Sequence, residues 1–271
     1  KILRRGKQVH VGRYEFVSGI SNIDLYNNLR LGRGMVPITV TLREGRRAEV
    51  YARVLARSLG VDSARIMQLV RDEQFVRSLG VEANNLEGYL FPDTYFFGWQ
   101  TEEEDILKRL VQQTFKVFND SLRERAAALG MSIHQVLTLA SIIEGEAFFD
   151  DERAKISGVY HNRLRKGIKL EADPTIQFLI PDGPRRILHK DLQIQSPYNT
   201  YRNYGLPPGP ICSPSAASIR AALYPEQHNY YFFVADGKGG HWFATTYAQH
   251  LANVRKFRRE RAEQMRAQSV S

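Results

Sequence analysis

Two carboxylates near the middle of the chain have a type and spacing that could do chemistry. Glu144 and Glu146 end an apolar run, residues 136–143, whose spacing is helical. Glu144 follows Leu137 by seven positions and Ala140 by four, so it projects from the same face as those apolar side chains. Burial there would favour the neutral carboxyl that a general acid needs near neutral pH. A structural glutamate paired with an Arg or Lys of the next helix would explain the same spacing.

Glu146 points roughly 200° away from Glu144 if the helix is regular, because an α-helix has 3.6 residues per turn. The two carboxyls can therefore face one cleft as an acid and a nucleophile only if the helix ends at Gly145. Most glycosidases place two carboxyls on either side of the bond that they cut. A lone carboxyl favours a reaction in which one group acts first as acid and then as base.

One of two notable loops carries side chains that suit a sugar ligand. Tyr198, Asn199 and Thr200 precede a rigid Gly-Leu-Pro-Pro-Gly segment, and such polar and aromatic side chains can bond sugar hydroxyls and stack on sugar rings. The Gly-rich turn at residues 236–241 could cradle a phosphate through backbone amides, but a plain hairpin loop explains it better.

The sequence contains none of the common cofactor or metal motifs. There is no P-loop, no Gly-x-Ser-x-Gly elbow and no His-Glu-x-x-His, and the seven His are scattered without ligand spacing. The single cysteine, Cys212, can form neither an internal disulfide nor a structural zinc site. We therefore expect neither a metal nor a cofactor.

Helices and short strands must position the candidate residues. The central helix starts with a capping box, Ser132 with Gln135, and is apolar nearly all round, so we expect it to be buried. A second box, Thr101 with Glu104, predicts the start of a long amphipathic helix. Two short strands are expected around the turn at residues 236–240, before a last helix.

Two further segments bear on the domain organisation. Residues 8–45 alternate, then become helical, then alternate again, which predicts a small module of strand, helix and strand. The aromatic stretch 89–97 fits either a core or a wall that contacts a ligand. The whole pattern predicts an α+β fold.

Length, composition and charge narrow the function classes. The 271 residues are 43% hydrophobic, which is typical of a globular chain, and no apolar run reaches the ~20 residues that cross a bilayer. The formal charge is +9, concentrated at the start, residues 1–7, and the end, residues 255–261, which suggests an anionic neighbour. A nucleic-acid partner is disfavoured, because no known binding motif and no basic stripe interleaved with aromatic residues is present.

Five blocks of sequence resemble one known family. They are Glu-Gly-Tyr-Leu-Phe-Pro-Asp-Thr-Tyr (87–95), Ala-Ser-Ile-Ile-Glu-Gly-Glu (140–146), Asn-Arg-Leu (162–164) with Asp-Pro-Thr (173–175), Tyr-Asn-Thr-Tyr-Arg-Asn-Tyr-Gly-Leu-Pro-Pro-Gly-Pro-Ile (198–211) and Phe-Val-Ala-Asp-Gly-Lys-Gly-Gly-His (233–241). In this order they are similar to the YceG/MltG-like endolytic murein transglycosylases. Gly145 departs from the family pattern, in which a bulkier residue stands there.

The resemblance implies a bacterial enzyme that cuts nascent peptidoglycan glycan strands. It implies a LysM-like module at residues 1–45 and a catalytic region at residues 46–271. It also implies a single-pass anchor upstream of Lys1 in the inner (cytoplasmic) membrane, a catalytic region on the periplasmic or outer face, and peptidoglycan synthases as possible partners. By the same match Glu144 occupies the position of the catalytic glutamate, with Glu146 as the second glutamate of the block.

The mechanism expected from this match is lytic. Glu144 would protonate the glycosidic oxygen and then, as a carboxylate, take the proton of the C6 hydroxyl of N-acetylmuramic acid, giving a 1,6-anhydro end. The expected cleft is lined by the Glu144 helix, the loop 198–204 and the turn 236–241, with Glu146, Tyr198, Asn199, Thr200, Asp236 and His241 binding substrate. A muramidase-type hydrolase and a non-catalytic glycan-binding or scaffolding protein are the alternatives.

Overall fold

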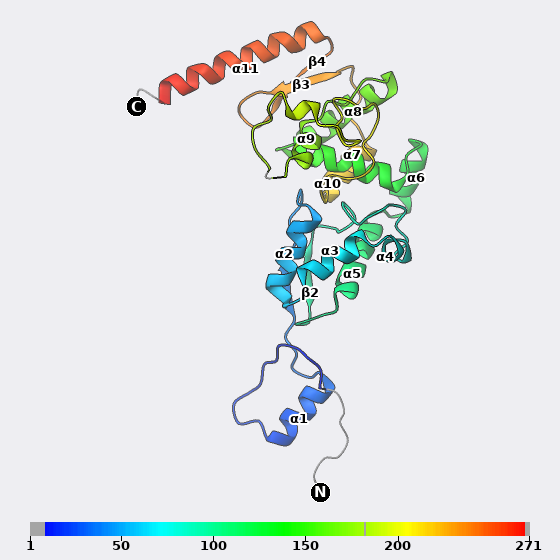
Figure 1. Cartoon of the computed structure of the whole chain (residues 1–271), viewed down its shortest axis with the longest axis vertical. Helices are drawn as coiled ribbons and strands as arrows, with labels where there is room; N and C mark the ends of the chain where they lie inside the picture. The colour runs from blue at the N-terminus through cyan, green and yellow to red at the C-terminus, as the bar shows by residue number, and fades with distance from the viewer. Residues whose placement is uncertain (1–8, 182, 269–271) are drawn as a thin grey trace.

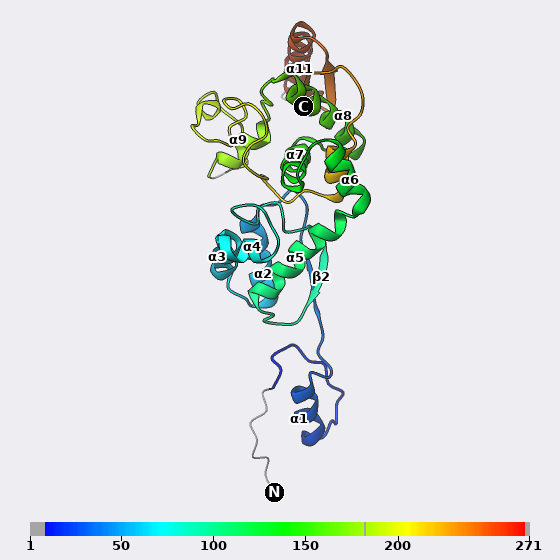
Figure 2. The ribbon, with the colours of Figure 1, turned by 90° about the vertical axis from the view of Figure 1, so that its right-hand side faces the viewer.

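A computed structural model describes residues 9–181 and 183–268, which form an elongated molecule (Figure 1). Helix α1 and its flanking loops lie at one end, a layer containing α2, α3 and α5 follows, and a second layer contains α7 to α10. The last helix, α11, lies at the other end of the long axis in both views (Figure 2). Most of the basic start of the chain lies outside the described residues.

The chain mixes helices with short strands, which confirms the expected α+β class. The α-helices are α1 (Asn22–Leu31), α2 (Ala48–Leu59), α3 (Ser63–Arg71), α4 (Glu73–Ser78), α5 (Glu103–Val117), α6 (Asp120–Ala128), α7 (Ile133–Glu146), α8 (Arg153–Lys166), α9 (Asp173–Leu179), α10 (Ala216–Leu223) and α11 (Tyr247–Gln268). Two short 3-10 helices are η1 (Asp150–Glu152) and η2 (Asp191–Gln193). The strands are β1 (Ile38–Thr41), β2 (Thr94–Phe97), β3 (Phe232–Ala235) and β4 (His241–Ala244).

The predicted module of strand, helix and strand is found only in part, since its helix and second strand are present and, among the described residues, its first strand is not. Strand β1 pairs antiparallel with β2, with Ile38 opposite Phe97 and Thr41 opposite Thr94. Between residues 9 and 37 the structure has helix α1 and one isolated bridge, Tyr14 with Met35. Alternation predicted a half-buried strand correctly, but it carries no information about the partner strand. A LysM-like fold for residues 1–45 and a boundary at that position stay predictions.

The aromatic stretch before α5 is core rather than a ligand-contacting wall. Tyr89, Phe91, Tyr95 and Phe97 are buried, whereas Phe96 is exposed. One continuous apolar core joins the layer of α2, α3 and α5 to that of α7 and α10. The buried residues of the aromatic stretch are therefore part of the core that both layers share.

The start of α2 is capped by a residue that lies just before this stretch. Arg47, at the N-cap position, makes no capping hydrogen bond with its side chain. The carboxylate of Glu87 accepts a hydrogen bond from the backbone N–H of Ala48 instead, at 3.1 Å. A carboxylate is well suited to this place, because the first amides of a helix lack partners and carry a partial positive charge.

The capping box predicted at Thr101 is wrong. The hydroxyl of Thr101 donates to the carbonyl of Gly98, and α5 begins at Glu103 with Glu102 at the N-cap position. Three consecutive glutamates favour this start electrostatically, because negative side chains stabilise a helix N-terminus.

Helix α7 is the buried helix that the sequence predicted. Both hydrogen bonds of the capping box between Ser132 and Gln135 are present, and residues 136–143 are all buried. The helix stays regular to Glu146, where the backbone N–H of Ala147 still donates to the carbonyl of Ile143. It therefore does not end at Gly145, and it carries two carboxylates on its last turn.

The C-terminal part is a hairpin followed by a helix, as expected. Strands β3 and β4 pair antiparallel, with Phe232 opposite Ala244, and α11 packs against both. Within residues 9–181 and 183–268, no single helix has the length and apolar character to cross a membrane. Helices α6 and α7 reach that length and composition only together, and they are bent by 90°.

Candidate active site

The two glutamates of α7 lie in different environments. The Oε2 atom of Glu144 accepts hydrogen bonds from the backbone N–H of Ser215 at 2.9 Å and from its hydroxyl at 2.6 Å. The same oxygen lies 3.3 Å from a guanidinium nitrogen of Arg153, and the two side chains are 5% and 10% exposed. Glu144 thus joins α7, α8 and the start of α10 through a buried ion pair.

Glu146 points to the other side of α7, as the helical period predicted. Its Oε1 atom accepts a 2.7 Å hydrogen bond from the hydroxyl of Tyr160 in α8. Burial raises the pKa of Glu146 to about 7, and the nearby negative charge of Asp173 adds to the rise, while the Tyr160 bond opposes it. A carboxyl with such a pKa can both donate and accept a proton near neutral pH.

Glu146 lines a cavity of about 700 Å³. This volume lies within the range of roughly 300–1,000 Å³ that is usual for ligand sites. In Figure 2, α9 and the loops beside it lie to one side of α7, above the layer of α2. The cavity walls come from the ends of α7 and α9, the segment 45–50 before and in α2, and the loop around residues 183–187.

Two residues fix the start of α9 against the end of α7. A Cβ atom placed on Gly145 would lie only 2.7 Å from Cβ of Pro174, so the helices meet here at a distance that only glycine allows. The carboxylate of Asp173, the first residue of α9, accepts a 2.6 Å hydrogen bond from the hydroxyl of Tyr201. Asp173 therefore forms part of the same cavity as Glu146, with its carboxylate held in place.

Two side chains of the predicted sugar-binding loop, Asn199 and Thr200, bond backbone groups of neighbouring segments. Asn199 is fully buried, and its amide donates to the carbonyls of Leu192 and Ile194. Thr200 is buried too, and its hydroxyl oxygen accepts from the backbone N–H of Ala172, just before α9. These partners give both side chains a structural role, and their binding of substrate stays a prediction.

Tyr198 contributes through an aromatic contact. Its ring packs on that of Phe178, with centroids 4.8 Å apart, and Phe178 lines the cavity. Tyr198 is thus in direct contact with a residue of the cavity wall.

The hairpin turn at residues 236–241 is not among the residues that line the cavity, and its part in the predicted cleft stays a prediction. A carboxylate oxygen of Asp236 accepts from the backbone N–H groups of Lys238 and Gly240, as in a plain hairpin loop. His241 bonds Glu152 through both its backbone N–H and its ring Nδ1, at 2.9 and 2.8 Å. Contacts of Asp236 and His241 with substrate stay predictions.

The Asn-Arg-Leu block has a structural explanation that sequence reasoning did not supply. The Asn162 amide donates to the carbonyls of His228 and Tyr230, and Arg163 donates to that of Tyr231. Both side chains are buried. Sequence reasoning also missed Tyr160, because its position one helix beyond Glu146 becomes visible only in three dimensions.

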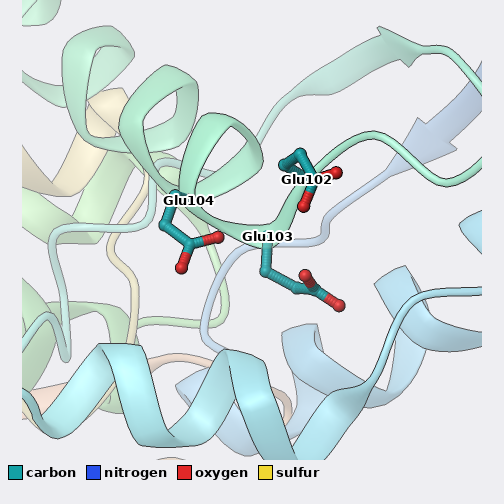
Figure 3. A group of neighbouring side chains, drawn as sticks. All are labelled: Glu102, Glu103 and Glu104. Carbon is teal, nitrogen blue, oxygen red and sulfur yellow. The ribbon is translucent and has the colours of Figure 1, made fainter.

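A cluster of three carboxylates lies outside this site. Glu102, Glu103 and Glu104 bring carboxylate oxygens within 4.8 Å of one another at the start of α5 (Figure 3). Glu103 accepts from the backbone N–H of Asp62, and Glu104 forms an ion pair with Arg65. Protein partners and the helix N-terminus explain these carboxylates without a ligand.

Comparison with known proteins settles the family. The model of the YceG-like family matches residues 1–256. The chain belongs to this family. The family resemblance found in the sequence is thereby confirmed.

Individual relatives agree with this YceG-like membership. The chain is 33% identical to the endolytic murein transglycosylase of Bacillus subtilis, over 91% of this chain and 72% of that protein. It is 27% identical to the endolytic murein transglycosylase of Streptococcus pneumoniae, over 90% of this chain and half of that protein. The crystal structure of a YceG-like protein from Listeria monocytogenes superposes with a TM-score of 0.75 at 31% identity, covering 90% of this chain and 84% of that one.

Proposed function

We propose that this chain is an endolytic peptidoglycan lytic transglycosylase in which Glu146 is the acid and base. The names of its relatives support the reaction class. The observation that carries the residue assignment is the position of Glu146, with a pKa of about 7, at the wall of the cavity. The proposed reaction cuts the bond between N-acetylmuramic acid and N-acetylglucosamine within a strand.

The geometry favours Glu146 over Glu144, the residue that the sequence match predicted. Three donor groups surround Glu144, two from Ser215 and one from Arg153, and all of them stabilise the carboxylate. The Oε2 atom of Glu146, by contrast, makes no hydrogen bond within the described residues, so it can meet a ligand.

The mechanism needs only one carboxyl. Protonated Glu146 donates to the glycosidic oxygen as the bond to C1 breaks, and the resulting carboxylate takes the proton from the C6 hydroxyl as that oxygen attacks C1. The ring closes to a 1,6-anhydro end, no water is consumed, and Glu146 returns to its protonated form. Tyr160 stabilises the carboxylate at the intermediate stage, because its hydroxyl already points at Oε1.

A muramidase-type hydrolase is the second candidate, favoured by one observation. Asp173 supplies a second carboxyl to the same cavity. In hydrolysing glycosidases such a second group activates water or attacks the sugar. The hydrogen bond from Tyr201 restrains the Asp173 carboxylate at the cavity edge, where it can equally orient a sugar hydroxyl.

The wider setting is also proposed from the family resemblance. It comprises a LysM-like glycan-binding module in residues 1–45, an anchor in the inner (cytoplasmic) membrane with the catalytic region on its periplasmic or outer face, and peptidoglycan synthases as partners. A scaffolding protein without catalysis would keep the same partners but leave the strands uncut.

Product analysis tests the reaction. Glycan strands digested by the protein should end in 1,6-anhydro-N-acetylmuramic acid, about 18 Da lighter than a reducing end, and should take up no oxygen-18 from labelled water. Fragments of many lengths should appear from the earliest times. Reducing ends that carry oxygen-18 would establish a hydrolase instead, and intact strands would favour the scaffold.

A further inference from the structure

The wall of the Glu146 cavity is rich in arginine. Four arginines contribute to its lining, Arg46 and Arg47 from the segment before α2 and Arg185 and Arg186 from the loop after α9. The acidic residues in the lining are Glu146 and Asp173. The residues that line the cavity therefore carry an excess of positive charge.

Two of these arginines are already engaged by protein carboxylates. Arg185 forms a two-pronged ion pair with Asp191, at 2.7 and 2.8 Å. Arg47 lies 3.5 Å from Glu49 and stacks over the ring of Phe178. Their charges are largely compensated within the protein.

Arg46 and Arg186 are in a different situation. Neither guanidinium has a carboxylate partner among residues 9–181 and 183–268, and both residues are exposed. The backbone of Arg46 is nevertheless fixed, because its carbonyl accepts a 2.9 Å hydrogen bond from the N–H of Ser213. Ser213 lies two positions before Ser215, the residue that bonds Glu144, so Arg46 is held in a rigid frame beside the end of α7.

A guanidinium presents paired donors that match a carboxylate. While a peptide is attached, the lactyl carboxyl of muramic acid is an amide, so the sugars of the strand are neutral and the free carboxylates belong to the peptide. Every internal cleavage position has such a peptide on the sugar whose C1 is attacked. A phosphate group of a strand end, by contrast, is absent from internal positions.

We propose that Arg46 and Arg186 bind carboxylates of the peptide attached to muramic acid, so that the protein prefers peptide-bearing strands to peptide-free ones. This inference rests on the proposed function and names the substrate class of that site. It assigns specificity to Arg46 and Arg186 and chemistry to Glu146, all of which line the cavity.

The test compares two glycans that differ only in their peptides. Strands with intact peptides are compared with strands that an amidase has stripped and whose freed lactyl carboxylates have been capped as methylamides. Both are cleaved by the full chain, and the ratio of their kcat/KM values is measured. We expect a ratio of about ten in favour of peptide-bearing strands, the effect of one or two partly exposed charge-assisted hydrogen bonds. Raising the ionic strength should lower the ratio, because salt screens exposed charges.

Arginine variants test which residues cause the preference for peptide-bearing strands. R46Q and R186Q should each lower the ratio, and the double variant should bring it close to one. R53Q is the matched control, since Arg53 is an exposed arginine of α2 that does not line the cavity, and it should keep the wild-type ratio. A wild-type ratio near one, or an unchanged ratio in the double variant, would overturn the proposal.

A binding measurement separates this proposal from the proposed reaction. E146Q protein, in which cleavage is blocked, should bind peptide-bearing strands about tenfold more tightly than stripped strands. The same preference should vanish when R46Q and R186Q are added. If wild-type protein yields no anhydro ends from either glycan, the proposed reaction fails, whereas equal binding of both glycans by E146Q removes the arginine proposal alone.

Discussion

The hydroxyl of Tyr160 donates a 2.7 Å hydrogen bond to Glu146 and thereby ties α8 to the last residue of α7. This bond stabilises the charged form of a carboxyl that burial otherwise keeps protonated. Because the two effects oppose each other, the pKa of Glu146 stays near neutrality instead of rising further. The pair therefore sets the pH at which the cavity can supply a proton.

Replacing Glu146 by Gln should abolish cleavage while the protein stays folded. The Gln carbonyl can still accept the bond from Tyr160, but the amide cannot exchange a proton with the glycosidic oxygen. We expect the rate of formation of anhydro ends to fall by about 10³-fold or more, measured by mass spectrometry. Cleavage near the wild-type rate by folded E146Q would exclude this assignment.

Replacing Tyr160 by Phe should move the pH profile of kcat/KM to higher pH. The profile reports the protonated form of Glu146, so the wild-type rate should fall as pH rises through about 7. Without the hydrogen bond the pKa of Glu146 rises, so the pH at which kcat/KM begins to fall becomes higher. The limiting rate drops about tenfold or more, because the carboxylate loses a stabilising partner. Y95F removes a similarly buried tyrosine hydroxyl outside the cavity and should leave that pH unchanged.

Replacing Glu144 by Gln should chiefly lower stability. The substitution leaves Arg153 buried with Asp150 as its remaining carboxylate partner. Breaking a buried ion pair on one side costs about 3 kcal/mol, which urea unfolding would detect. The folded fraction should still cleave glycan, and adding R153M should restore part of the stability. A stable but inactive E144Q protein would return the catalytic role to Glu144, as the sequence match predicted.

Glu87 should make the protein less stable as pH rises from about 4.5 to about 7. Burial raises the pKa of Glu87 to about 7, although the bond from Ala48 opposes the rise. The folded state therefore retains a proton that the unfolded state releases above its ordinary pKa of about 4.5, and the stabilisation is lost as pH passes the folded value. Comparing unfolding free energies at pH 5 and pH 8, E87Q should show a smaller difference than wild type. An equal difference would mean that Glu87 ionises normally.

The sequence predicted the parts of the site that depend on one helix. The capping box at Ser132, the burial of residues 136–143 and the divergence of Glu144 from Glu146 all follow from local rules and helical period. The sequence could not show which of the two carboxyls faces the cavity. That depends on Arg153 of α8 and Ser215 before α10, which contact Glu144 only in the folded chain. Spacing alone therefore left both roles open, and the family match selected the glutamate that the structure pairs with Arg153.

Other differences between the predicted and the observed structure also arise from contacts between segments that are distant in the sequence. Alternation identified β1, but its partner β2 lies more than fifty residues further along the chain. Asn199 and Thr200 are polar residues of a loop, which suggested ligand contacts. They are buried instead, because their side chains bond backbone groups of neighbouring segments. Composition shows that such a side chain needs a partner, and only the structure shows that the partner is internal.

Strand β1 also has a mechanical consequence. Three residues, 42–44, separate it from Gly45, where the cavity wall begins. A pull on the chain before Ile38 acts along β1, across the hydrogen bonds that join it to β2, so the ladder from Ile38 to Thr41 shares the load. Tension in the N-terminal segment is thus borne by a small sheet before it can reach Arg46 and the end of α7.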